Sequence, residues 1–195
     1  YTVVTSYFSS TMDRSIGPYS FSIFGISFTF SEIPVSWKDS LQSFWVILFS
    51  GVMATLWTKM GEAQPKTPLK FALSLFILGL GYLCFVPFIR SGVVMGLFVF
   101  AFAILLNTLA ELLLSPISLS FATKIAPEVF KTQMVSFNFL TISLGFTLGG
   151  VLFDELYNAA KVVEFYRLLG ILGIGSGVVL LVMLPVLNRL LSDID

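Results

Sequence analysis

Five long stretches of this chain are almost free of charge, and they limit the fold more than any other feature. The stretches are residues 40–58, 71–89, 93–123, 134–153 and 168–188. Each has about the 20 apolar residues, or more, that an α-helix needs to cross the hydrocarbon core of a bilayer. Only 11% of the residues are charged, against about 25% in soluble domains. We therefore predict an all-α fold, an integral membrane helical bundle.

The first 40 residues give weaker indications of secondary structure than the five stretches do. Residues 1–12 are uncharged, but a helix of that size reaches only about 18 Å, so we expect the outer end of a sixth, truncated span. The chain begins with Tyr1 rather than Met, and we expect a piece of a longer protein, with residues 1–195 forming one bundle. Residues 15–39 alternate Phe and Ser in part; because a lone strand cannot cross lipid, we expect an interfacial loop or a short hairpin there.

Several classes of function are excluded by composition. The net charge is zero, so no electrostatic footprint for nucleic acid exists. The chain has no histidine and one cysteine, Cys84, which removes Ser-His and Cys-His catalysis, cysteine metal clusters and an internal disulfide. We therefore expect no enzyme, no catalytic residue, no metal site and no cofactor.

Glu111 is the one charged residue within the five stretches. A carboxylate at a helix centre in a bilayer costs roughly 3 kcal/mol, so such a residue is a functional-site hypothesis by default. Asn107 and Ser115 share its helix face at spacings of four, and Pro116 loosens the backbone just after it. Three interpretations stay open: a substrate or proton site, a structural ion pair with a helix outside this chain, or a position outside the membrane core.

Three motifs carry a resemblance to a known family. They are E-L-x-x-S-P-x-x-L-S-x-x-T-K-x-A-P over residues 111–127, I-P-x-S-W-x-x-S-L over 33–41 with L-W-x-K-x-G-x-x-Q-P-x-x-P-x-K-F-A over 56–72, and Q-M-x-x-x-x-F-L over 133–140. These patterns resemble the tenth, eighth and eleventh helices of proton-dependent oligopeptide transporters in the major facilitator superfamily. The resemblance implies the C-terminal six-helix half of such a transporter, with its first helix truncated.

The resemblance also implies roles for single residues. The family's acidic residue of the tenth helix, which holds the peptide's amino terminus, falls on Glu111, and its bending proline falls on Pro116, which we expect to act in gating. The chain departs from the family at several positions: Gln42-Ser43 stand where Asn-Pro is usual, Asn138 where a Trp is usual, and Ala110 and Ser118 where glycines are usual. We predict a substrate site of Glu111, Ser115, Asn107, Gln42 and Asn138.

The predicted function is proton-coupled uptake of di- and tripeptides by alternating access. The predicted partners are the lipid bilayer, the peptide, the proton and an N-terminal six-helix half, without nucleic acid. Two alternatives stay open: a non-transporting membrane fragment or scaffold, and a related transporter with a different small substrate. Six basic residues against five favour cytoplasmic loops at 59–70 and 124–133, in a plasma or bacterial inner membrane.

Two further patterns have open interpretations. Gly145 with Gly149, and Gly173 with Gly177, have the small-xxx-small spacing that lets helix backbones approach closely; they either pack helices or reflect the ordinary glycine content of membrane helices. The charged residues of 59–70 are either solvated loop residues or gating contacts.

Overall fold

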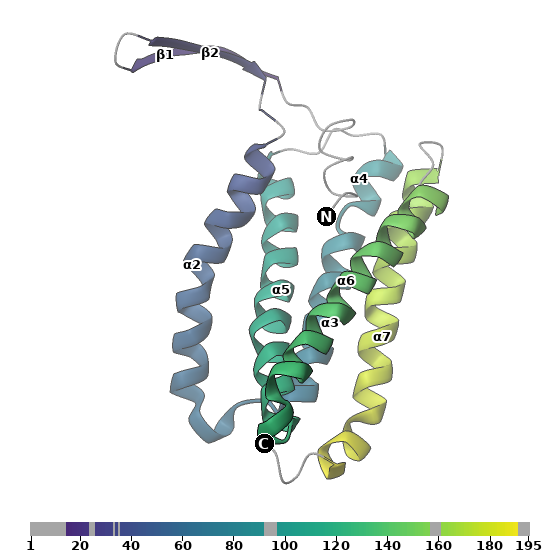
Figure 1. The fold of residues 1–195 in the computed structure, drawn as a ribbon. Helices are drawn as coiled ribbons and strands as arrows, with labels where there is room; N and C mark the ends of the chain where they lie inside the picture. Colours follow the sequence, from purple (N-terminus) through teal and green to yellow (C-terminus); the bar gives the residue numbers. More distant parts are fainter. Residues whose placement is uncertain are drawn as a thin grey trace.

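The structure, a computed structural model, describes residues 15–23, 26–32, 34, 36–91, 97–156 and 161–190. Five long helices run side by side along one axis (Figure 1). They are α2 (Trp37–Met60), α3 (Thr67–Leu83), α5 (Leu97–Ile125), α6 (Lys131–Leu156) and α7 (Val162–Leu190). A short helix, α4 (Val86–Ser91), follows α3, and single 3₁₀ turns, η1 (Gly61–Ala63) and η2 (Glu128–Phe130), follow α2 and precede α6. All five long helices have the length and composition to cross a membrane, so the predicted helical membrane bundle is confirmed.

The helices end where the sequence carries glycine and proline. Gly61 has φ +48° and donates its backbone N–H to the Trp57 carbonyl, a left-handed conformation that suits glycine because it has no Cβ. Pro68 lies at the start of α3, where a missing N–H costs nothing. Pro127 follows α5 and precedes η2.

The helices reach beyond the charge-free stretches at several ends. The helix α2 begins at Trp37 rather than at residue 40, so Lys38 and Asp39 lie in its first turn. The helix α5 continues through Pro116 without interruption. The predicted partial span at residues 1–12 lies outside the described residues.

A two-stranded hairpin precedes the bundle. Strands β1 (Ser15–Ile23) and β2 (Ile26–Glu32) pair antiparallel, with Phe21 opposite Phe28. The hairpin projects from the end of the bundle where α2 begins (Figure 1). Of the two forms expected for this segment, the structure has the hairpin.

The tightest packing in the bundle joins α3 and α7. A Cβ built on Gly79 would lie 2.8 Å from the Gly170 carbonyl oxygen, and one on Gly173 would lie 2.9 Å from the Gly79 Cα. A Cβ built on Gly177 would likewise lie 3.1 Å from the Phe76 ring. The packing interpretation is therefore confirmed for the Gly173 pair of glycines, which allow two helix backbones to touch.

The other glycine pair is different. A Cβ on Gly145 or Gly149 would meet no described atom within 4 Å. Within the part of the chain that the structure describes, these two glycines of α6 therefore pack against nothing.

An aromatic cluster closes the bundle at the end that carries α4. Phe85, Phe100 and Tyr166 are fully buried there, together with Phe165. The rings of Phe85 and Tyr166 lie 5.3 Å apart, and those of Phe153 and Phe165 lie 5.9 Å apart in an edge-to-face arrangement, the geometry that aromatic pairs favour. The cluster joins α5, α6 and α7 to the turn before α4.

The helices α2 and α6 lie at the open side of this packed group. Within α6, whose residues are all described, no residue is buried, and within α2 the only buried residue is Lys38. Large apolar side chains are exposed on both helices, for example Phe44, Ile47, Phe137 and Phe146. Such broad apolar faces require lipid or another protein segment against them.

The loop between α2 and α3 is tied down by one lysine. Lys70 donates to Gln64 Oε1 at 2.9 Å and lies 4.5 Å above the Trp57 ring, while Gln64 donates to the Trp57 carbonyl at 2.7 Å. Glu62 and Lys66 are exposed. Lys70 is thus a structural contact of the loop, whereas its two charged neighbours face outward.

Candidate functional site

A cavity of about 630 Å³ lies between α2, α3, α5 and α6. We call it the Glu111 cavity. Its walls are largely apolar, with a small number of polar groups, as ligand sites usually are. The lining residues are Lys38, Gln42, Ser74, Leu78, Tyr82, Ile104, Asn107, Ala110, Glu111, Leu114 and Phe146.

The centre of the site is a hydrogen bond between α2 and α5. Gln42 Nε2 donates to Glu111 Oε2 at 3.0 Å, and the two residues are 69 positions apart in the chain. Bonds to a charged acceptor contribute about 1.5–3 kcal/mol, more than neutral ones. Because a carboxylate has room for about four hydrogen bonds, Glu111 can accept a ligand N–H beside Gln42.

Asn107 lies one turn before Glu111 on α5. Its Nδ2 donates to the Ala103 carbonyl at 3.0 Å, while its buried Oδ1 has no hydrogen-bond partner among the described residues. A buried acceptor without a partner costs about 1–3 kcal/mol. The Oδ1 of Asn107 is therefore a second acceptor that a ligand or a water molecule in the cavity can satisfy.

The wall behind Glu111 is held by α3. Buried Ser74 donates to the Ala110 carbonyl at 2.9 Å, which fixes α3 against the turn of α5 that carries Glu111. Tyr82 lines the cavity and also approaches Tyr166 of the aromatic cluster, with ring centroids 6.4 Å apart. The hydrogen bond from α3 thus stabilises the position of the α5 backbone that carries the Glu111 carboxylate.

Pro116 lies inside α5, five residues after Glu111. Proline cannot donate to the carbonyl four residues earlier, which is that of Leu112. Next to it, Ser118 Oγ donates to the Ser115 carbonyl at 3.0 Å. The turn of α5 below the carboxylate therefore has fewer main-chain bonds than the rest of the helix.

The predicted site residues fall into two groups. Gln42, Asn107 and Glu111 line one cavity. Ser115 and Asn138 are absent from its lining within the described chain; Ser115 is exposed on α5, and Asn138 is half-buried on α6.

The sequence analysis did not predict four polar or aromatic residues of the cavity, which are Lys38, Ser74, Tyr82 and Phe146. The spacing of four between Lys38 and Gln42 was the one available signal for Lys38, because residues four apart share a helix face. Tyr82 and Phe146 follow only from how α3 and α6 pack.

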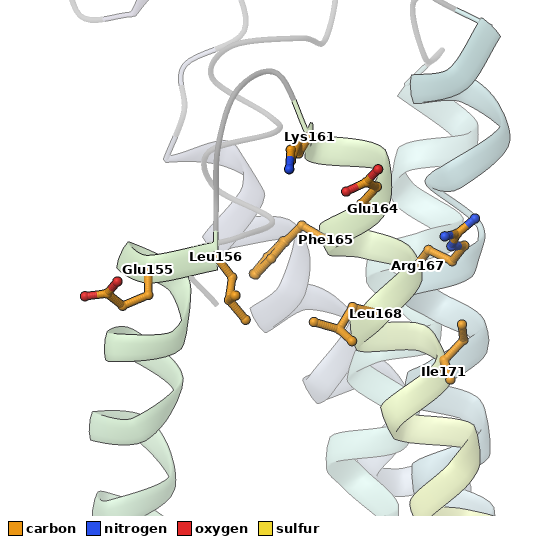
Figure 2. A pocket seen from close by; sticks show the side chains of 8 residues that line it. All are labelled: Glu155, Leu156, Lys161, Glu164, Phe165, Arg167, Leu168 and Ile171. Atoms are coloured by element: carbon orange, nitrogen blue, oxygen red, sulfur yellow. The ribbon is translucent and has the colours of Figure 1, made fainter.

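A second cavity, of about 530 Å³, lies where α6 ends and α7 begins. Figure 2 shows that Leu156 and Phe165 point toward the gap between these helices, whereas Glu155 points away from it. Glu155, Glu164 and Arg167 are all exposed. These charges are solvated surface groups, and the cavity lacks a carboxylate within a long apolar stretch such as Glu111, which distinguishes the first cavity.

Comparisons with known proteins identify a family for this chain. The sequence profile of the POT family matches residues 4–169. Di-/tripeptide transporters of Lactococcus lactis subsp. cremoris and of L. lactis subsp. lactis are 34% and 36% identical over 172 and 176 residues, covering 86% and 88% of this chain. The chain spans about a third of the length of these curated relatives, 34% of each.

Solved structures extend the similarity to the fold. A crystal structure of a peptide transporter POT in complex with sulfate superimposes with a TM-score of 0.82 at 28% identity, covering 97% of this chain and 36% of that one. A POT family transporter in complex with 5-aminolevulinic acid superimposes with a TM-score of 0.75 at 25% identity, covering 94% and 36%. The chain therefore belongs to the POT family of peptide transporters and is not an enzyme.

Proposed function

We propose that this chain forms the C-terminal half of a proton-coupled transporter that takes up di- and tripeptides by alternating access. The observation that carries the proposal is Glu111, the one charged residue of α5 apart from Lys124 in its last turn, hydrogen-bonded to Gln42 in the wall of a cavity. A peptide's ammonium group is a charge-assisted donor for such a carboxylate. The partners are the peptide, the proton, the bilayer and a second six-helix half.

The open side of the bundle supports the need for a second half. The apolar faces of α2 and α6 are exposed, and the Glu111 cavity opens among them. In transporters built from two repeats, the substrate site lies at the interface of the repeats near the bilayer midplane. We include Ser115 and Asn138 in the proposed site as well. They lie outside the lining of the Glu111 cavity in this half, and a second half is needed to enclose them.

Pro116 has a mechanical role in the proposal. Alternating access moves one half against the other around a fixed site, and α5 lacks one main-chain hydrogen bond just after Glu111, at Pro116. Bending at Pro116 would move the cytoplasmic end of α5 relative to the carboxylate. The proposal places loops 59–70 and 124–133 in the cytoplasm, and the protein in a plasma or bacterial inner membrane.

The relatives support peptides as substrates. The Lactococcus relatives are named di-/tripeptide transporters, and one similar structure holds 5-aminolevulinic acid, which also carries an amino group. A different small amine-bearing substrate is therefore the second candidate, favoured by the two departures at Gln42 and Asn138. A non-transporting fragment or scaffold is the third.

The test is uptake of a labelled dipeptide by proteoliposomes that contain the complete transporter, with an inward proton gradient. We expect Glu111→Gln to abolish accumulation, because the neutral amide cannot pair with the peptide's ammonium group. The matched control is Glu128→Gln, which removes an exposed carboxylate paired with Lys131 at 3.1 Å and should leave uptake unchanged.

Three results would contradict the proposal. Normal dipeptide uptake by the Glu111→Gln protein would rule out the proposed contact between Glu111 and the peptide's amino group. Uptake that does not depend on the proton gradient would rule out proton coupling. Absence of uptake for every dipeptide and for 5-aminolevulinic acid would favour the scaffold.

A further inference from the structure

Two arginines line one cavity that the proposed function does not use. The cavity, of about 490 Å³, lies between the end of α3, the short helix α4 and the start of α7, and we call it the arginine cavity. A smaller cavity, of about 300 Å³, shares Arg90 and Arg167 with it. The residues that line the arginine cavity are Leu83, Val86, Pro87, Arg90, Ser91 and Arg167.

The positive charge around this cavity is not balanced by acidic groups. Within the described chain, neither Arg90 nor Arg167 forms an ion pair. Lys161 and Glu164 line the smaller cavity with them, which gives three basic groups and one acidic group. A single exposed arginine is ordinarily a solvated surface group, but like charges held together repel one another. The stability of the bundle therefore gives no reason for this cluster, whereas a bound anion would relieve the repulsion.

The arginine cavity lies at the depth of lipid headgroups. The helix α7 has 29 residues, about 43 Å of helix, whereas the hydrocarbon core of a bilayer is about 30 Å thick. About one to two turns at each end of α7 therefore extend into the headgroup layer, and Arg167 lies in the second turn. Arg90 lies in the last turn of the membrane-capable segment Thr67–Ser91.

The surroundings of the cavity face lipid. Its walls come from α3, α4 and α7, whereas the proposed second half covers α2 and α6. Figure 2 shows that the Arg167 side chain leaves α7 on the side away from α6. Toward the bilayer centre, Leu80 lies one turn before Leu83 and is 51% exposed, and Ile171 lies one turn after Arg167 and is 56% exposed. Apolar surface thus continues from the arginines into the hydrocarbon layer.

We propose that the arginine cavity binds an anionic phospholipid, with its phosphate on Arg90 and Arg167 and its acyl chains along Leu80 and Ile171. A guanidinium group matches the oxygens of a phosphate in a two-point contact, and basic pockets between membrane helices are typical sites for anionic headgroups. A free phosphate would meet the same arginines, but the apolar floor of the cavity and its depth favour a lipid. The inference does not depend on which substrate the transporter carries.

The experiment offers the complete transporter, purified in detergent, an equimolar mixture of phosphatidylglycerol and phosphatidylcholine with the same acyl chains. Native mass spectrometry measures the ratio of the two lipids that stay bound. We expect the wild type to retain roughly tenfold more phosphatidylglycerol, because each basic group near a membrane surface strengthens the binding of anionic lipid severalfold. The double variant Arg90→Gln, Arg167→Gln should lower this ratio about threefold or more.

Two controls accompany the double variant. Lys124→Gln removes an exposed basic residue in the last turn of α5, outside the arginine cavity, and should leave the ratio unchanged. Free glycerol phosphate, which has the headgroup chemistry without acyl chains, should not displace phosphatidylglycerol at equal concentration.

Three outcomes would overturn the inference. Equal retention of the two lipids by the wild type would do so whether or not the double variant folds. A wild-type ratio in the double variant would place the anionic lipid elsewhere on the protein. Displacement of phosphatidylglycerol by an equal concentration of glycerol phosphate would assign the cavity to a free phosphate. Because uptake of peptide is not measured, this result and the proposed function can fail independently.

Discussion

The α3–α7 pair and the wall formed by α2, α5 and α6 use their residues in opposite ways. In the α3–α7 pair, Gly79, Gly170 and Gly173 bring two backbones into contact, and Gly177 is buried. In the wall, a Cβ on Gly145 or Gly149 would meet no described atom within 4 Å, and a hydrogen bond from Gln42 to Glu111 joins α2 to α5. The helices α2 and α6 are also less apolar than α3 and α7.

The difference indicates that the α3–α7 pair stabilises the bundle, whereas the wall formed by α2, α5 and α6 binds ligand. Close backbone packing has no room for water or ligand, and it holds its geometry because interiors are dense. A carboxylate at the edge of a cavity can bind a ligand while it keeps its bond to the protein, since it has room for about four hydrogen bonds. We therefore expect changes in the α3–α7 pair to act on stability, and changes in the wall to act on transport.

After Glu111→Gln, which should abolish uptake, the largest expected effect is on transport, from Gln42→Leu. The variant loses a hydrogen bond to a charged group, worth about 1.5–3 kcal/mol, that holds the Glu111 carboxylate in place. We expect the apparent affinity for peptide to fall roughly ten- to hundredfold. The concentration dependence of dipeptide uptake measures the affinity, and melting in detergent measures the stability.

The control for Gln42→Leu is Gln133→Leu, at an exposed amide in the first turns of α6. We expect it to change neither the affinity nor the melting temperature. A fall in melting temperature for Gln42→Leu with unchanged uptake would reverse the roles of the two regions.

The next effect is on stability, from Gly79→Leu. Its Cβ would lie 2.8 Å from the Gly170 carbonyl oxygen and from Ile174, so α3 and α7 must separate. Overpacking of this kind costs about 1–3 kcal/mol. Thermal unfolding of the detergent-solubilised protein should show a lower midpoint.

Gly175→Leu is the matched change on the same helix as Gly170, with no atom within 4 Å of its Cβ. It should leave the midpoint as in the wild type. Equal midpoints for the Gly79 and Gly175 variants would show that the α3–α7 contact is looser than described.

The smallest effect is expected where the two regions meet, from Ser74→Ala. The variant loses the hydrogen bond from Ser74 to the Ala110 carbonyl at 2.9 Å, a net contribution of about 1 kcal/mol. Because this bond braces the turn of α5 that carries Glu111, uptake and stability should both fall slightly. Ser176→Ala, which removes a bond to Leu172 within α7, should change only stability or neither; an effect on uptake from Ser176→Ala alone would contradict the assignment.

Much of the fold followed from local patterns. The charge-free stretches predicted all five long helices, and they did so because a helix in lipid satisfies its own backbone and needs only apolar side chains. The helix ends were less predictable, since Lys38 and Asp39 continue α2 outward beyond residue 40. The hairpin at β1 and β2 was one of two forms that the Phe and Ser alternation allowed.

The candidate site was predictable only in part. Glu111 was predicted from the free-energy cost of a carboxylate in an apolar stretch, and Asn107 from its position four residues before Glu111. Both signals are local in the sequence. The donor to Glu111 is 69 residues away on α2, and only the family resemblance pointed to Gln42. Ser115 shares the predicted face of α5 yet lies outside the cavity, since spacing shows which residues share a face and leaves open where a cavity ends.

By itself, the sequence determined the class of protein, the number of long helices and the residue whose charge needs an explanation. These properties depend on the transfer of short segments from water to lipid, which each segment decides alone. The tertiary structure alone decided which glycines touch, that Gln42 reaches Glu111, and that Lys38 is buried in the same cavity. These depend on which faces of distant helices meet, and that is a property of the whole bundle.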